Sequence, residues 1–132
     1  MSKLFEKKYI KLKLNKIINI YLIYKKKFYV KFFLSKKIKD KIRTAEFLKV
    51  NLCSGPNIVD NYINIDVKGD VDIKIDLKKS LIPLPSNSTK YLVCMSAINY
   101  FNFYESKNLI QEIFRIMAPE GIVRFGVQDL EL

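Results

Sequence analysis

A chain of 132 residues, 49% of them hydrophobic, is long enough for one domain with its own core and too apolar to be disordered. It contains no histidine, which excludes Ser-His-Asp and Cys-His hydrolases and removes the commonest metal ligand, so no metal site is expected. The net charge of +11 is concentrated at the N-terminus. Residues 1–43 contain 15 Lys and Arg but only 2 acidic residues, whereas the rest of the chain contains 9 Lys and Arg and 11 acidic residues.

Residues 1–45 are predicted to form a basic, amphipathic helical arm in front of the domain. No glycine or proline occurs before Gly55, and many apolar residues fall near helical spacing. These residues are Ile10, Leu14, Ile17, Ile18, Tyr21 and Phe28. Lys16 interrupts the longest uncharged run, so this segment is too short to span a bilayer. No signal-peptide cleavage site follows it, and a cytoplasmic location is expected.

The sequence leaves three interpretations of this arm open. Its lysines can simply occupy solvated positions of a helix that packs on the domain through its apolar residues. A basic amphipathic helix can also lie on an anionic membrane surface. A basic helix with tyrosines can instead bind the phosphates of a nucleic acid.

Residues 46–132 are predicted to form an α/β domain with a mostly parallel sheet. The apolar runs predict strands at 47–53, 62–65, 71–76, 90–96 and 122–127. A helix is predicted over Lys107–Met117, with Ser106 as its N-cap. The link from Gly55 to Tyr62 is too short for a crossover helix, which leaves the pairing of the first two strands open. Cys53 and Cys94 lack CxxC spacing and are expected to be free thiols.

The first two predicted strands frame a candidate nucleoside site. The first ends in a turn of small residues, which let a ligand approach the backbone, and the second ends in Asp66. A carboxylate at that position can accept two hydrogen bonds from a ribose diol. Only eleven residues separate Gly55 from Asp66, whereas a dinucleotide-binding motif places its acidic residue about 20 residues on.

Six blocks in order carry a resemblance to a known family. They are V-N-L-C-S-G-P-N (50–57), Y-I-N-I-D (62–66), D-I-K-I-D-L (72–77), I-P-L-P-S-N-S (82–88), Q-E-I-F-R-I-M-A-P-E-G (111–121) and V-Q-D-L (127–130). Together they resemble the small, type 11-like class I S-adenosylmethionine-dependent methyltransferases. That family has L-N-L-G-C-G-P-N, G-W-I-N-x-D, D-(I/V)-x-x-D-L, L-P-F-P-D-N-S, R-E-I-Y-R-V-L-K-P-G-G and V-P-D-L. The resemblance covers about residues 46–132.

The resemblance implies a Rossmann-like sheet of methyltransferase type and transfer of a methyl group from S-adenosylmethionine to an unknown acceptor. The turn from Cys53 to Asn57 would lie under the methionine part of the cofactor, Asp66 at the ribose, and Asp76 and Leu77 beside the adenine. The full predicted set of cofactor-binding residues is Asn51, Cys53, Ser54, Gly55, Pro56, Asn57, Asp66, Val67, Asp76, Leu77, Met95 and Ser96. No catalytic residue is assigned.

The chain departs from the family pattern in two ways. Cys53, Asn61 and Glu120 stand where the family has glycine, and of these asparagine adopts positive φ most readily. The family's sheet also continues with two strands that have no counterpart here, so we expect a sheet truncated after its fifth strand, with an open edge for a partner or a second copy. The alternative function is a non-catalytic methyltransferase-like protein that binds a partner or a membrane surface.

Overall fold

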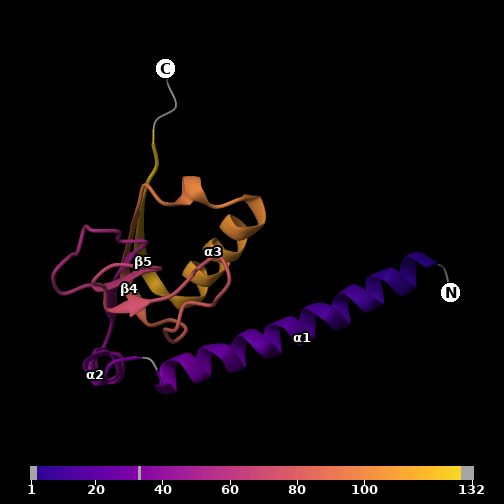
Figure 1. The fold of residues 1–132 in the computed structure, drawn as a ribbon, viewed down its shortest axis with the longest axis horizontal. Helices are drawn as coiled ribbons and strands as arrows, with labels where there is room; N and C mark the ends of the chain where they lie inside the picture. The colour runs from indigo at the N-terminus through magenta and orange to yellow at the C-terminus, as the bar shows by residue number, and fades with distance from the viewer. Residues whose placement is uncertain (1–2, 33, 129–132) are drawn as a thin grey trace.

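The computed structural model describes residues 3–32 and 34–128, which form a long helix and an α/β domain (Figure 1). The helices are α1 (Lys3–Phe32), α2 (Lys36–Thr44) and α3 (Phe103–Ile116), with a short 3-10 helix, η1 (Ile98–Tyr100), before α3. The strands are β1 (Leu48–Leu52), β2 (Ile63–Asp66), β3 (Ile73–Lys74), β4 (Thr89–Met95) and β5 (Met117–Gly126).

The five strands form one sheet in the order β3-β2-β1-β4-β5, and every neighbouring pair is parallel. This confirms the predicted α/β class, and the sheet is compatible with a Rossmann-like fold. The predicted third strand, 71–76, is too long, because only Ile73 and Lys74 belong to β3. Asp72, just before this strand, accepts a hydrogen bond from the backbone N–H of Asn64 at 2.8 Å. The Asp72 side chain thus takes the Asn64 N–H, which a longer β3 would need for backbone pairing with β2.

β1 and β2 pair in parallel although no helix connects them. Residues 53–62 make the connection as an irregular loop, and two buried amides hold it in place. The Asn51 Nδ2 group donates to the backbone oxygen of Asn57 at 2.8 Å and to Asn64 Oδ1 at 2.9 Å. Asn64 Oδ1 also accepts from the backbone N–H of Val59 at 2.9 Å. These bonds satisfy loop groups that a crossover helix would have paired within itself.

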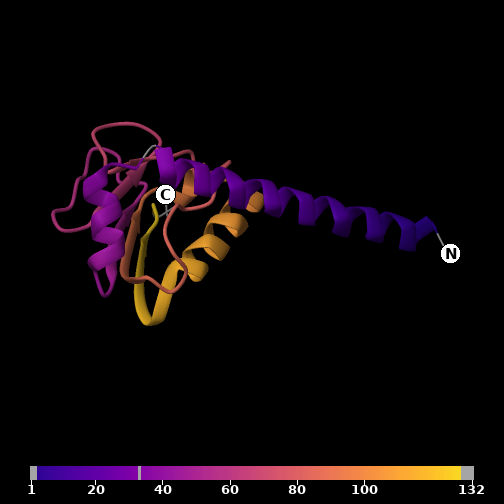
Figure 2. The same cartoon turned by 90° about the horizontal axis from the view of Figure 1, so that it is seen from below.

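α2 and α3 lie on opposite sides of the sheet (Figure 2). α3 begins at a capping box: Asn102 Oδ1 accepts from the backbone N–H of Glu105, and Glu105 Oε2 accepts from the backbone N–H of Asn102, both at 2.9 Å. The prediction of Ser106 as N-cap is therefore wrong, because Ser106 lies within the first turn and its N–H donates to Asn102 O. Asn102 satisfies two backbone groups at once with Glu105 three residues on, which Ser106 cannot do.

An Arg115–Glu112 pair on α3 fastens the loop that precedes β4. Arg115 Nε and Nη2 each lie 2.8 Å from one oxygen of Glu112. The same guanidinium donates to the backbone oxygens of Ile82 at 2.9 Å and Leu84 at 3.0 Å, and Glu112 accepts from the N–H of Ile82 at 2.9 Å. Buried carbonyls of residues 82–84 thus find their partners on α3.

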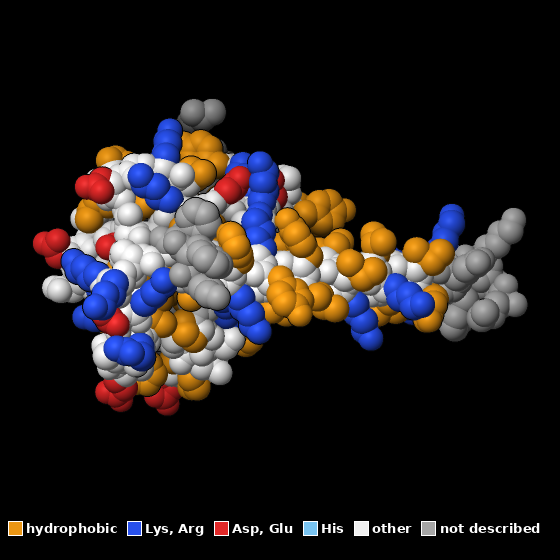
Figure 3. All heavy atoms as spheres, turned by 60° about the horizontal axis from the view of Figure 1, so that its bottom comes forward, with side chains coloured by type: hydrophobic (Ala, Val, Ile, Leu, Met, Phe, Trp, Pro, Cys, Tyr) orange, Lys and Arg blue, Asp and Glu red, His pale blue; other side chains and the backbone are white. Residues whose placement is uncertain are grey.

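α1 is helical as predicted, but the prediction that it is amphipathic is wrong. Its apolar side chains are distributed around the helix rather than gathered on one face. α1 runs well past the domain (Figures 1 and 3). Of its side chains at 7–30, only Leu22, Lys26, Tyr29 and Val30 are partly buried. Lys26 Nζ donates to Leu84 O at 2.8 Å, and the Tyr29 hydroxyl donates to Lys74 O. α2, by contrast, is amphipathic and buries Ile38.

None of the helices within 3–32 and 34–128 combines the length and the apolar character needed to cross a bilayer.

Candidate functional site

A cleft of about 550 Å³ lies at the carboxyl ends of the strands. Its lining comes from the segment after each of the first four strands: 53–57, 66–68, 75–78, and 95–97 with 100–101. The chain runs from β1 to one side of the sheet and later returns to place β4 on the other side. In open α/β sheets, ligands bind at such a reversal of strand order, outside the carboxyl ends.

The structure brings together all of the predicted cofactor-binding residues except Asn51. Those that line the cleft are residues 53–57, Asp66, Val67, Asp76, Leu77, Met95 and Ser96. Asn51 is 5% exposed and does not line the cleft. Its amide instead holds the 53–62 loop, so its position as a contact residue is not supported and its role is structural.

Asp66 holds the loop that forms one side of the cleft. Its Oδ2 accepts from the backbone N–H of Gly55 at 2.9 Å, and its Oδ1 accepts from the N–H groups of Val67 at 2.7 Å and Lys68 at 3.3 Å. A carboxylate offers about four acceptor positions. Three are used here, so the remaining position, on Oδ2, is free for a ligand hydroxyl.

Charged groups of both signs surround the cleft. Asp76 Oδ1 accepts from the backbone N–H of Lys78 at 3.0 Å, and Asp76 Oδ2 lies 3.5 Å from Lys79 Nζ. Lys78 Nζ lies 3.8 Å from Glu105 Oε2 and 5.4 Å from the centre of the Phe101 ring. A ligand that carries both a cation and an anion would find opposite charges here.

Three residues around the cleft adopt left-handed backbone conformations. The φ angles are 55° at Cys53, 54° at Gly55 and 51° at Ser96. Glycine adopts this conformation freely, whereas residues with a Cβ pay roughly 1–3 kcal/mol. Cys53 follows β1 and Ser96 follows β4, so the two strained positions lie at the ends of adjacent strands. Strain of this kind gathers at functional sites.

The two cysteines are neighbours, and both are free. A hydrogen bond with the Cys94 thiol, together with burial, raises the pKa of Cys53 above its usual range. The same hydrogen bond lowers the pKa of Cys94, which is buried. Because a thiol with a raised pKa is a poor nucleophile, Cys53 acts as a small wall of the cleft.

Sequence reasoning missed part of the lining. The missed residues are Lys68, Ile75, Lys78, Tyr100 and Phe101, whereas Ala97 lines the cleft beside Met95 and Ser96 as the resemblance implies. Lys68, Ile75 and Lys78 each adjoin a predicted position in sequence. Tyr100 and Phe101 carried a weaker signal, because aromatics at a strand-to-helix junction usually pack in the core; here Tyr100 is 70% exposed.

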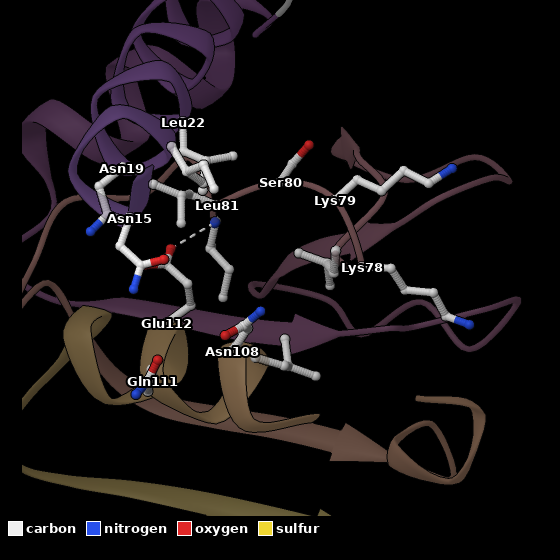
Figure 4. A pocket seen from close by; sticks show the side chains of 14 residues that line it. Asn15, Asn19, Leu22, Lys78, Lys79, Ser80, Leu81, Asn108, Gln111 and Glu112 are labelled. Atoms are coloured by element: carbon white, nitrogen blue, oxygen red, sulfur yellow. Dashed lines mark hydrogen bonds between the residues drawn. The ribbon is translucent and has the colours of Figure 1, made fainter. Parts of the chain in front are cut away.

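A second cavity of about 500 Å³ separates α1 from α3 and adjoins the cleft at Leu77 and Lys78 (Figure 4). Side-chain amides of α1 and α3 line it together with residues 77–82. It lies beside the edge of the domain rather than at strand ends, and no predicted site residue except Leu77 borders it.

Comparisons of the chain with protein-family models, curated proteins and solved structures found no match. Within the residues that the structure describes, no three Cys, Asp or Glu side chains are grouped as metal ligands.

Proposed function

We propose that residues 46–132 form an S-adenosylmethionine-dependent methyltransferase domain whose acceptor is unassigned. The observation that carries the proposal is that residues of three separate sequence blocks, 53–57, Asp66 and 76–77, line a single cleft together with Met95 and Ser96 at the end of β4. On this proposal, β1 to β5 correspond to the first five strands of the family's sheet, and within the described residues the sheet ends at β5.

The backbone supports the proposal at each position where a family glycine is replaced. Cys53, Asn61 and Glu120 have φ angles of 55°, 65° and 59°. These are left-handed conformations, in which glycine is the residue without strain. On this proposal, the chain keeps the left-handed backbone of the family at these three positions although the glycines have been replaced.

Gly121, one of the two family glycines that are retained with Gly55, also has a physical reason. A Cβ there would lie 2.9 Å from Ala118 O and 3.2 Å from Thr89 O, and against the Met117 side chain. β5 therefore has no room for a larger residue at this position.

The residues of the cleft suit the proposed cofactor. Asp66 supplies a carboxylate at the expected ribose, Asp76 supplies one beside the expected adenine, and Ile75, Leu77 and Phe101 supply an apolar wall for a flat base. When bound, the cofactor supplies a methyl group activated by the positive sulfur. The protein then has only to position the two reactants, which requires no histidine.

Two observations favour the alternative, a methyltransferase-like domain that does not bind the cofactor. Asp66 already accepts three backbone hydrogen bonds, and the Cys53 side chain adds a sulfur where the family has none. Both features reduce the room and the acceptor capacity for a ribose and a carboxypropyl chain.

Calorimetric titration with S-adenosylhomocysteine distinguishes the two. The wild-type chain is compared with Asp66→Asn and with Asp70→Asn, which removes the same charge from the same loop but outside the cleft. We expect micromolar binding by the wild type and by Asp70→Asn. In Asp66→Asn, loss of a charge-assisted hydrogen bond should weaken binding roughly 10- to 100-fold.

Thermal unfolding of all three proteins identifies any variant that has lost its fold. No binding by a well-folded wild-type chain would exclude the proposal and leave the non-catalytic alternative.

A further inference from the structure

Five apolar side chains of α1 follow the spacing of a coiled-coil seam. Ile10, Leu14, Ile17, Tyr21 and Tyr24 are separated by four, three, four and three residues. A repeat of 3.5 residues keeps such a row on one side of a helix that winds around another. The exposed fractions of these side chains run from 56% at Ile10 to 68% at Tyr24. The row is therefore exposed to solvent along its whole length.

α1 contacts its own domain through different residues. In Figure 4, Asn15, Asn19 and Leu22 point from α1 toward α3 and residues 80–82. Further along the helix, Lys26 and Tyr29 donate hydrogen bonds to the domain. With Leu14 and Tyr21 at heptad position a, these five residues occupy the outer positions b and f, whereas Ile18 and Lys25, which also border cavities between α1 and the domain, occupy the flanking position e. The domain thus leaves the seam accessible.

We propose that α1 associates through this seam with α1 of a second copy, as a parallel coiled coil. The seam itself contains no lysine from Ile10 to Tyr24, although α1 is rich in lysine. Each copy would bury apolar side chains that the isolated chain exposes, and the domains would lie on the outside of the assembly. This inference is independent of the proposed methyltransferase function.

The charges beside the seam select the parallel orientation. The flanking positions e hold Lys11, Ile18 and Lys25, and the flanking positions g hold Lys13, Ile20 and Lys27. In parallel coiled coils a g residue faces the e residue five positions later on the other helix.

Lys13 of one chain then faces Ile18 of the other, and Ile20 faces Lys25. An antiparallel pair aligned over the seam would instead place Lys11 opposite Lys25 and Lys13 opposite Lys27. Like charges at such positions destabilise a coiled coil, whereas a lysine stem packs well along an isoleucine.

The seam residues also bear on the number of helices. Leu14 occupies position a, and Ile10 and Ile17 occupy position d. Leucine at a with isoleucine at d favours three or four strands over two. The parallel g-to-e contacts are the same for two, three or four helices. The mass measured by sedimentation equilibrium therefore gives the number of copies.

A second copy explains the helix better than an anionic surface does. Nucleic acid phosphates would pair with the lysines but leave isoleucine and leucine exposed. A helix that lies on a lipid surface has its apolar residues gathered on one face, whereas those of α1 surround the helix.

The test uses the full chain and a matched pair of variants, Leu14→Glu and Leu12→Glu. The two leucines are 57% and 55% exposed and two residues apart, but Leu12 occupies the outer position f. Both variants change the charge and the apolar surface equally. Sedimentation equilibrium should give at least twice 15.5 kDa for the wild type and for Leu12→Glu. In Leu14→Glu a charge buried in the seam should weaken association roughly 100-fold.

The salt dependence of association distinguishes a second copy of α1 from an anionic membrane surface or a nucleic acid. Copies that each carry +11 repel one another, so association through the seam should tighten as NaCl is raised from about 50 to 500 mM. A monomeric wild type would overturn the proposal. Equal loss of association in both variants would also overturn it. Binding of the monomer to anionic vesicles or to an oligonucleotide that weakens with salt would assign α1 to that surface instead.

Discussion

α1 and the α/β domain are built from the same residue types and bury them very differently. In the domain, Leu52 and Leu92 are at most 1% exposed, whereas Leu12 and Leu14 of α1 are more than half exposed. Lysine, isoleucine and tyrosine are abundant in both. Composition therefore does not decide burial in this protein.

The difference comes from where the apolar residues fall. In β1 and β4, buried apolar residues such as Val50 and Leu92 pair in register within a sheet that has a helix on each side, and turns at glycine, proline and asparagine bring the strands together. In α1 the apolar residues surround the helix, so one domain contact can cover only a part of them. The rest need a partner outside the described chain, which is the basis of the coiled-coil proposal.

A leucine-to-alanine substitution should change the free energy of unfolding far more in the domain than in α1, and this is the largest effect that we expect. Leu92→Ala removes a fully buried side chain and leaves a cavity, so we expect the free energy of unfolding to fall by about 3 kcal/mol. Leu12→Ala in α1 should change it by less than about 0.5 kcal/mol. Urea unfolding of both variants measures this. Equal losses would mean that α1 is part of the cooperative core.

Arg115→Met tests whether the domain depends on its polar contacts as well. The variant removes the guanidinium bonds to Ile82 O, Leu84 O and Glu112. Leu84 O and Glu112 keep their bonds from Lys26 Nζ and from the N–H of Ile82. We expect a loss of about 2–3 kcal/mol, because unpaired polar groups in partly buried positions are costly. Arg43→Met is the control, since the ion pair that Arg43 makes with Asp40 is exposed. A similar loss in both variants would contradict this account.

The contact between α1 and the domain should respond to pH through Lys26. Burial, and then the charge of Arg115, lower the pKa of Lys26 from 10.5 to about 8. Between these values the unfolded chain binds more protons than the folded chain, so stability should rise as pH increases from 8 toward 10. Because Lys26 is only half-buried, we expect a rise of about 1 kcal/mol. Lys26→Met should flatten the profile between pH 8 and 10, and an unchanged slope would exclude Lys26 as the cause.

The smallest expected effect concerns backbone strain at the cleft. Ser96 is exposed and has a φ of 51°, so Ser96→Gly removes the clash of a Cβ at the cost of a more flexible unfolded chain. We expect a net gain of about 0.5 kcal/mol. Ser96→Ala keeps the Cβ and should not stabilise the protein. Thermal unfolding compares them, and a gain in Ser96→Ala would show that strain is not the reason.

Sequence reasoning predicted the α/β class and most of the cleft because strand ends are marked locally. An apolar run that stops at small residues or at Asp66 places those residues at one edge of a parallel sheet, whatever the rest of the chain does. The assignment of the cleft to a methyltransferase cofactor stays a prediction.

The predictions failed where a specific side-chain contact determines the role of a residue. Asn51 has the position of a ligand contact in the motif, but its amide is engaged by Asn57 and Asn64, which sequence spacing does not reveal. Asn102 rather than Ser106 is the N-cap because Asn102 and Glu105 form a reciprocal pair of hydrogen bonds. For α1, near-helical spacing of some apolar residues suggested one apolar face, although the remaining apolar residues fill the other sides.

The short connection between β1 and β2 has a consequence for how the domain folds. Leu52 pairs with Ile65, 13 residues later in the chain, and with Cys94, 42 residues later. Closing the shorter loop costs about 1 kcal/mol less chain entropy. Of the two parallel pairings of β1, the one with β2 is thus the first that the chain can reach, and its connecting loop is also one side of the cleft. A substitution at residues 53–57 should therefore alter the folding rate and ligand binding together.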